Sequence, residues 1–336
     1  MTVHHTDVAI VGAGPVGLFA VFELGMLGLR CHVMDALSAA GGQCVALYPE
    51  KPIYDIPGYP VVEAQQLIDR LAEQAAPFEP VYHLGHPVTH LEAIGEDRWR
   101  LTNAGGAVVE AGAVMIAAGV GAFGPHRPPL AGLAEYEGKS IFYLVERREA
   151  FRGKRVVIAG GGDSAIDWAI SLAEIAASVA VVHRRDKFRA APESERRLWA
   201  LAAEGRIEMV IPYQLAGLQG SGGQLEAVIV QTLKGENRTV PADILLPFFG
   251  LSMDLGPIAE WGLTLENKHI AVDQATCMTS RPGLFAIGDI ATYPGKLKLI
   301  LTGFSEAAMA AHAIHPRLRP DEVLRFEHST TKGVPV

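Results

Sequence analysis

The sequence predicts an α/β fold with two Rossmann-like dinucleotide-binding domains, each of which also contains a small antiparallel β element. Short apolar, β-branched runs alternate with helical patterns along the chain, as in parallel sheets with right-handed crossovers. The order strand, glycine loop, helix and strand occurs twice, over residues 7–35 and 154–185. The chain has 336 residues, 49% of them hydrophobic, which suffices for two domains with a core each.

The first glycine loop has the sequence GAGPVG, includes Pro15, and follows an apolar strand. Gly12 permits the tight turn, Gly14 lets the backbone approach a pyrophosphate, and Gly17 lets the following helix pack close to the strand. The helix N-terminus then offers amide hydrogens to the phosphates. Asp35 ends the next strand, where an acid accepts hydrogen bonds from a ribose diol, so this site suits FAD or NAD. The predicted elements are a strand at 8–12, a helix at 13–29 and a strand at 31–35.

The second glycine loop, GGGDSA, has alanine in the third small position, and its next strand ends in His-Arg-Arg instead of an acid. Arginine binds phosphate through paired, charge-assisted hydrogen bonds, so the second dinucleotide is predicted to be NADPH. Arg189 either joins this phosphate cluster or packs its aliphatic stem. The residues assigned to NADPH are Gly160, Gly162, Asp163, Ser164, Arg184, Arg185 and Arg189.

The remaining segments indicate how the domains are connected. Residues 99–119 and 225–250 each show alternation, a glycine turn and a final apolar run, as a small antiparallel sheet followed by a buried strand would. Residues 283–314 return to strand, loop and helix without a glycine loop, so we expect them to complete the first sheet. The predicted domains are an FAD domain at 1–119 and 250–336 and an inserted NADPH domain at 120–249.

Composition narrows the class of protein further. The formal net charge of −8 argues against nucleic acid as the main partner. We find neither the pattern of an export signal nor the roughly 20 apolar residues of a membrane span, so a cytoplasmic protein without a membrane partner is expected. The three cysteines lack a Cys-x-x-Cys spacing, which argues against a disulfide framework and a thiolate metal site.

Two dinucleotide sites on one chain suit an enzyme in which a nicotinamide delivers hydride to a flavin. This reaction chiefly requires the two rings to stack in register, so no general acid or base is demanded. We interpret five histidines as surface or loop residues without a metal role. They are His4, His5, His83, His86 and His90.

Six segments taken in order resemble the thioredoxin-reductase-like ferredoxin:NADP reductases, and the resemblance runs essentially from end to end. They are GAGPVG, GGQCVALYPEKPIYDIPGYP, GGGDSAIDWA, HRRDKFRA, LFAIGDI and HSTT. Thioredoxin reductases of the same fold have a Cys-x-x-Cys where this chain reads YLVE, at residues 143–146. Without that dithiol, electrons cannot leave the flavin by thiol–disulfide exchange.

The resemblance also implies roles for individual residues. Tyr48 would stack on one face of the flavin ring and His328, in the C-terminal segment, on the other, and these two are the catalytic candidates. Thr330 would bond near the ring edge, and Asp289 would bind the ribityl and pyrophosphate region. The residues assigned to FAD are Gly12, Gly14, Pro15, Gly17, Asp35, Gln43, Tyr48, Val88, Phe123, Asp289 and Thr330.

The implied activity is hydride transfer between NADPH and FAD, followed by one-electron transfer to or from ferredoxin or flavodoxin. Relatives of this type are homodimers, so a homodimer is expected. A basic strip, defined as residues 139–155 together with Lys296 and Lys298, is our hypothesis for the docking site of an acidic ferredoxin. Two alternatives stay open, namely an NADPH oxidase or quinone reductase that uses a small acceptor, and a non-catalytic flavin redox sensor.

Overall fold

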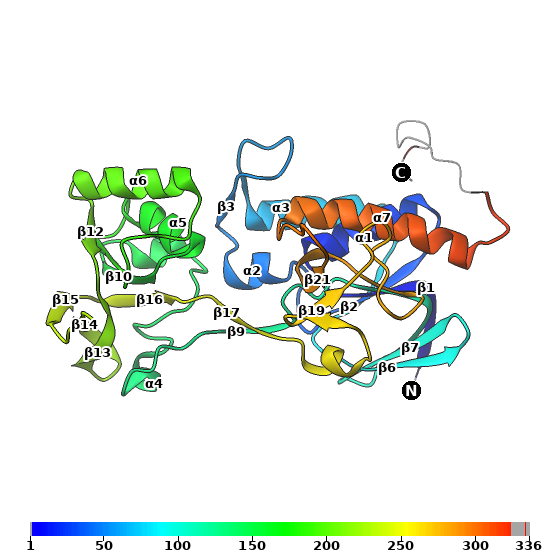
Figure 1. The fold of residues 1–336 in the computed structure, drawn as a ribbon, viewed down its shortest axis with the longest axis horizontal. Helices are drawn as coiled ribbons and strands as arrows, with labels where there is room; N and C mark the ends of the chain where they lie inside the picture. Colours follow the sequence, from blue (N-terminus) through cyan, green and yellow to red (C-terminus); the bar gives the residue numbers. More distant parts are fainter. Residues whose placement is uncertain (1, 324–332, 334–336) are drawn as a thin grey trace. The chain divides into compact units, whose positions relative to one another are not determined.

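The computed structural model describes residues 2–323 and 333, except for the side chains of residues 122–125 and 251–253. The chain divides into two compact units (Figure 1). Unit 1 comprises residues 1–122 and 253–336, and unit 2 comprises residues 123–252. The strands β9 (Ala122–Pro125) and β17 (Leu251–Asp254), at the two points where the chain passes between the units, pair with each other. Unit 2 is therefore a continuous stretch inserted into unit 1.

Unit 1 is built on a sheet in which parallel strands continue into an antiparallel meander. The strand order is β5-β2-β1-β8-β7-β6, and β20 also pairs with β8 in parallel. The last block of the chain thus completes the first sheet, as predicted. The strands are β1 (Val3–Val11), β2 (Cys31–Met34), β5 (Val81–His83), β6 (Val88–Gly95), β7 (Arg98–Asn103), β8 (Val108–Ile116) and β20 (Leu284–Ala286).

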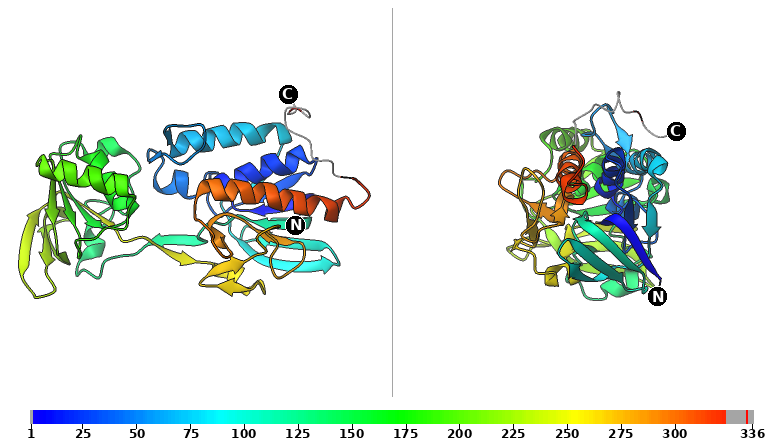
Figure 2. Two further views of the ribbon diagram at one scale, coloured as in Figure 1. Left: turned by 45° about the horizontal axis from the view of Figure 1, so that its top comes forward. Right: turned by 90° about the vertical axis from the view of Figure 1, so that its right-hand side faces the viewer.

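Three helices cover one face of this sheet, α1 (Pro15–Met26), α3 (Ala64–Ala75) and α7 (Ile300–Leu318), and Figure 2 shows them side by side. Ile10, Leu24 and Phe285 are fully buried between helices and sheet. The opposite face packs a second core around Leu101 and Ile116. The remaining elements are α2 (Gln43–Leu47), β3 (Pro52–Ile53), β4 (Val62–Glu63), η1 (Ala76–Phe78), η3 (Gly256–Glu260), β18 (Leu265–Glu266), β19 (His269–Ala271), η4 (Gly288–Ile290) and β21 (Ala291–Thr292).

Unit 2 repeats the parallel arrangement in a smaller sheet of order β12-β11-β10-β16. A separate antiparallel sheet of order β13-β14-β15 accompanies it, so each unit has the antiparallel element that the sequence predicts. The strands are β10 (Arg155–Gly160), β11 (Ser178–Val182), β12 (Ile207–Val210), β13 (Gln214–Ser221), β14 (Gln224–Gln231), β15 (Asn237–Pro241) and β16 (Ile244–Phe248). The helices are α4 (Leu133–Tyr136), η2 (Arg148–Phe151), α5 (Asp163–Leu172) and α6 (Pro192–Ala203).

Candidate functional site

The glycine loop of unit 1 leaves no room for side chains at two of its glycines. Gly12 has φ +114°, and its N–H donates to the carbonyl of Met34 over 2.8 Å. A Cβ at Gly12 would lie 2.3 Å from the carbonyl oxygen of Ala117, and one at Gly17 would lie 2.0 Å from that of Gly12. Both distances are impossible for real atoms, so larger residues would force the strand, loop and helix apart.

Gly14 differs from its neighbours because the space beside it is open. The nearest atom to a Cβ there would be the Cα of Gly42, at 4.0 Å. Gly14 is the N-cap of α1, whose first turn starts at Pro15 and has no side-chain cap. The N–H groups of that turn therefore remain available to an anion at the positive end of the helix dipole. This cradle of backbone fits the pyrophosphate of a dinucleotide.

Asp35 lies beside this cradle, at the carboxyl end of β2. Its Oδ2 accepts a hydrogen bond from the N–H of Ala13 at 2.6 Å, and its Oδ1 accepts one from Leu37 at 2.8 Å. Burial raises the pKa of Asp35, and these two hydrogen bonds oppose the shift. Each carboxylate oxygen retains a lone pair, so the group can still accept hydrogen bonds from ribose hydroxyls.

Helix α2 brings the next candidates close to the same loop. Gln43 is its first residue, and the Gln43 amide nitrogen would lie 3.4 Å from a Cβ at Gly119, just after β8. Tyr48 is the C-cap residue of α2. Burial raises the pKa of the Tyr48 hydroxyl, and the nearby groups of Cys44 and Asp289 raise it further. Tyr48 and Asp289, which are far apart in the sequence, are therefore close together in space.

The turn that presents Asp289 is held by a buried carboxylate that the sequence analysis missed. Glu306, on α7, is 1% exposed and accepts hydrogen bonds from the N–H of Gly288 and the hydroxyl of Tyr293, both at 2.7 Å. Lys296 forms an ion pair with the same carboxylate. The only signal in the sequence is a charged residue within the apolar, small-residue run of this helix.

This ion pair corrects one expectation about docking. The side chain of Lys296 is 4% exposed, and its charge is neutralised by Glu306. Its inclusion in the basic strip is therefore wrong. Three arginines of the strip also have carboxylate partners within unit 2. Arg148 pairs with Glu174, Arg152 with Glu149 and Arg155 with Asp243.

Four further residues assigned to the flavin site are Val88, Phe123, His328 and Thr330. Val88, the first residue of β6, is 6% exposed and packs in the core that contains Leu101 and Ile116. Phe123 belongs to β9, and its side chain lies outside the described part of the chain, as do His328 and Thr330 entirely. Their assignments stay predictions from the resemblance.

The glycine loop of unit 2 has the same construction as the first. Gly160 has φ +157°, and a Cβ there would lie 2.5 Å from the carbonyl oxygen of Phe248 and 3.1 Å from the Cβ of Ala165. Gly162 is the N-cap of α5, again without a side-chain cap, and Asp163 and Ser164 are exposed in the first turn. This loop, too, fits a pyrophosphate.

Two backbone N–H groups attach the segment after β11 to this loop by hydrogen bonds. The N–H of Arg189 donates to the carbonyl of Gly161 at 2.7 Å, and the N–H of Ala191 donates to the carboxylate of Asp163 at 2.9 Å. The ring of His183 stacks on Phe188, with 5.1 Å between centroids. Three arginines of the segment are exposed and, within the described residues, pair with no carboxylate. They are Arg184, Arg185 and Arg189.

The cysteines do not form a redox pair. Cys31, Cys44 and Cys277 are all buried and free. Burial raises the pKa of Cys44 to about 11 and those of Cys31 and Cys277 to about 12, so the reactive thiolate is scarce at neutral pH. At the YLVE segment, the hydroxyl of Tyr143 donates to Glu137 at 2.7 Å, and Val145 is fully buried.

Two parallel-sheet units, each with a glycine loop that fits a pyrophosphate, define a dinucleotide-dependent oxidoreductase of the two-domain class. The family model of the pyridine nucleotide-disulphide oxidoreductases matches residues 6–313, and the chain belongs to this family. None of the helices in the described part of the chain combines the length and the apolar composition that a membrane span requires.

Two curated relatives are similar over essentially their whole length. A protein of Paramagnetospirillum magneticum named ferredoxin–NADP reductase is 63% identical over 335 residues, which cover 100% of this chain and 99% of that protein. A protein of Rhodospirillum rubrum with the same name is 64% identical over 333 residues, which cover 98% and 96%.

Solved structures agree with the fold. Lactococcus lactis thioredoxin reductase in its FR conformation has a TM-score of 0.81 at 24% identity and covers 94% of this chain and 99% of its own. The thioredoxin reductase of T. acidophilum has a TM-score of 0.81 at 23% identity and covers 93% of this chain and 98% of its own. The chain therefore has the thioredoxin-reductase fold without the redox cysteine pair.

Proposed function

We propose that this protein is an FAD-dependent ferredoxin:NADP reductase. FAD binds at the glycine loop of unit 1, and NADP(H) binds at the glycine loop of unit 2. The observation that carries this assignment is the contrast between the two sites. Asp35 places a carboxylate beside the first loop, whereas exposed arginines that pair with no carboxylate of the described residues follow the strand beside the second. A carboxylate suits a ribose diol, and arginine suits the 2′-phosphate that distinguishes NADP from NAD.

The residues present fit FAD in unit 1. The first turn of α1 would hold the pyrophosphate, and Asp35 would hold the adenosine ribose. Asp289 would contact the ribityl chain, with Gln43 and Tyr48 beside it. Bound FAD supplies the ability to accept hydride from NADPH and to exchange single electrons with a protein partner. The chain itself binds, orients and shields the reacting rings, so no side chain needs to move a proton.

The cysteines support electron exit to a protein partner instead of a disulfide. All three thiols are buried, and their pKa values are raised by burial, so a thiol relay from the flavin is disfavoured. The relatives' name supports ferredoxin as that partner. Flavodoxin as a second partner and a homodimeric state, which the family resemblance implies, and a cytoplasmic location, which the sequence pattern favours, complete the proposal.

The proposed docking site for an acidic ferredoxin is smaller than the sequence indicates. Three basic residues of the strip in unit 2 are exposed and form no salt bridge among the described residues. They are Lys139, Arg147 and Lys154. Charges of this kind raise the rate of encounter with an oppositely charged protein and fix its orientation.

The test is NADPH-driven reduction of cytochrome c by the flavin-loaded protein, measured with and without ferredoxin. A rate that rises steeply with ferredoxin supports the proposal, because ferredoxin then carries the electrons. An equal rate without ferredoxin, together with fast NADPH consumption by oxygen or quinone, would instead identify a small-acceptor reductase. A turnover below about one per minute, against a median near 10 per second for enzymes, would point to a redox sensor.

A further inference from the structure

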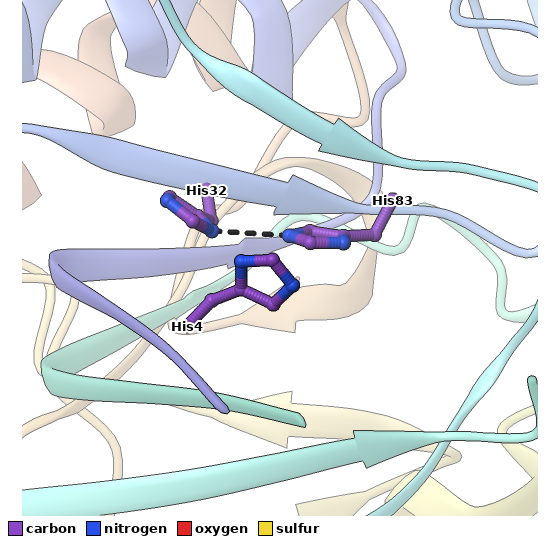
Figure 3. Close-up of side chains that lie close together, drawn as sticks. All are labelled: His4, His32 and His83. Atoms are coloured by element: carbon purple, nitrogen blue, oxygen red, sulfur yellow. Dashed lines mark hydrogen bonds between the residues drawn. The ribbon is translucent and has the colours of Figure 1, made fainter. Parts of the chain in front are cut away.

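Three histidines from three neighbouring strands of unit 1 converge on one point (Figure 3). His4 lies on β1, His32 on β2 and His83 on β5. The Nδ1 of His32 and the Nε2 of His83 are 3.0 Å apart, and one ring nitrogen of each of the three residues lies within 4.8 Å of the others. The expectation that His4 and His83 are surface or loop residues is wrong, because both belong to strands and are half-buried.

The sheet itself explains why the three rings share a face. His83 is paired with Met34 and His4 with Val109, and both of these partners pack in the core on the face opposite the helices. Paired residues on parallel strands point to the same side of the sheet. His32 lies between Cys31 and Val33, which pack against the helices, so its ring points to that opposite face as well.

The three side chains of the cluster are of a type that binds metal ions. Imidazole nitrogen is a preferred ligand of zinc and similar divalent ions. The His32 and His83 rings share a hydrogen bond, and a bound metal ion would replace it with a coordinate bond to each ring.

The distances also agree with such a site. Ligands at about 2.05 Å in a tetrahedral zinc site lie about 3.3 Å from each other. The separation between His32 and His83 is within a few tenths of an ångström of that value. The ring of His4 needs to approach by at most about 1.5 Å, and rotation of its side chain near the start of β1 provides such a movement.

We propose that His4, His32 and His83 form a binding site for a borderline divalent transition-metal ion of the zinc type. Three imidazole nitrogens provide the protein ligands, and water completes the tetrahedron. The site uses none of the residues assigned to FAD or NADPH. It would tie β1, β2 and β5 together close to the FAD site, because the carbonyl of His83 accepts the N–H of Asp35 at 3.1 Å.

The experiment is a zinc titration of the full-length, flavin-loaded protein, without a histidine tag and after removal of metals by a chelator. A chromophoric chelator competes for Zn²⁺ and reports its binding. One equivalent per chain is expected, and His32→Asn or His83→Asn should weaken binding at least about tenfold, because one ligand of three is lost. The matched controls are His86→Asn and His90→Asn, which change exposed histidines outside the cluster and should leave binding unchanged.

Three results of the titration would overturn the proposal. They are the absence of saturable zinc binding, an equal loss of zinc affinity in the control variants, and retention of one bound zinc ion per chain when all three histidines are replaced. If the His32 or His83 variants lose their flavin or the circular dichroism of the folded protein, His4→Ala becomes the test of zinc binding. Residue 4 lies at the start of β1, so its replacement leaves the rest of the strand intact. X-ray absorption of the zinc-loaded protein should show nitrogen ligands near 2.0 Å, and sulfur near 2.3 Å would instead indicate the cysteines and refute the site.

Discussion

The carboxylate of Asp35 accepts a hydrogen bond from the backbone N–H of Ala13, with 2.6 Å between the two atoms. This bond connects the end of β2 to the glycine loop, and a second bond from Leu37 fixes the other carboxylate oxygen. The acid therefore shapes the loop before any nucleotide binds, in addition to its proposed contact with the ribose.

Replacement of Asp35 by asparagine should weaken FAD binding at least about tenfold. The amide group turns one acceptor oxygen into a donor, which leaves an N–H of the loop unpaired and removes a charged acceptor for the ribose. Flavin retained after dialysis, measured by absorbance, reports the effect. Asp69→Asn, an exposed change on α3, is the control. Full retention of FAD by D35N would contradict the assignment.

Replacement of both Arg184 and Arg185 by alanine should lower the preference for NADPH over NADH roughly tenfold or more, because charge-assisted bonds to the 2′-phosphate are lost. The ratio of kcat/KM for the two nucleotides is the measurement. Arg197→Ala removes an exposed arginine from α6 of the same unit and should leave that ratio unchanged. Equal use of NADH and NADPH by the unmodified protein would contradict the assignment directly.

Glu306→Gln should destabilise the folded protein by about 3–5 kcal/mol, because Lys296 would remain as a buried cation without its partner. Denaturant unfolding of the flavin-loaded protein measures this loss. A second replacement, Lys296→Met, removes the uncompensated charge and should restore more than half of the lost stability. If the double variant is no more stable than E306Q, the ion pair is not the cause.

The three thiols should be inaccessible to modification in the folded protein. Their pKa values are raised by burial, to about 11 for Cys44 and about 12 for Cys31 and Cys277, so at pH 8 each thiol is protonated as well as covered. A chromogenic disulfide reagent should titrate none of them in the native state and three after denaturation. A thiol that reacts rapidly while ferredoxin-dependent turnover falls in parallel would revive a cysteine relay.

Charge reversal at Arg147 and Lys154 should reduce ferredoxin-dependent turnover and flatten its dependence on ionic strength. Arg148 is a poorer choice for this test, because it also donates to the carbonyl of Ser171 at 2.7 Å and its reversal would disturb the fold. Lys234→Glu, an exposed change in the turn after β14, is the control. Unchanged kinetics in the double variant would remove the strip from the docking site.

The features that could be predicted from sequence are local ones. Gly12 and Gly160 are recognisable because each must follow an apolar strand and open a helix, and the backbone there excludes any side chain. Asp35 and Arg184 follow from their place at the end of the next strand. Each of these signals lies within about 35 residues of chain, the length of one strand–helix–strand unit.

The features that were missed depend on pairing between distant segments. Asp243 neutralises the charge of Arg155, and a carboxylate on another element neutralises that of Lys296. A count of charges along the chain therefore overestimates the positive charge that the basic strip offers to a partner. The histidine cluster was missed for the same reason. His4, His32 and His83 meet only because the strand order is β5-β2-β1, which periodicity alone does not reveal.

The pairing of β9 with β17 has an evolutionary consequence. The two ends of residues 123–252 meet in one short ladder, and the N–H of His126 donates to the carbonyl of Gly250 at 3.1 Å. A segment whose ends adjoin can be replaced as a cassette without cutting the sheet that joins β8 to β20. Recombination at these two points would exchange the proposed NADPH site together with Phe123, while the glycine loop and Asp35 of unit 1 stay in place.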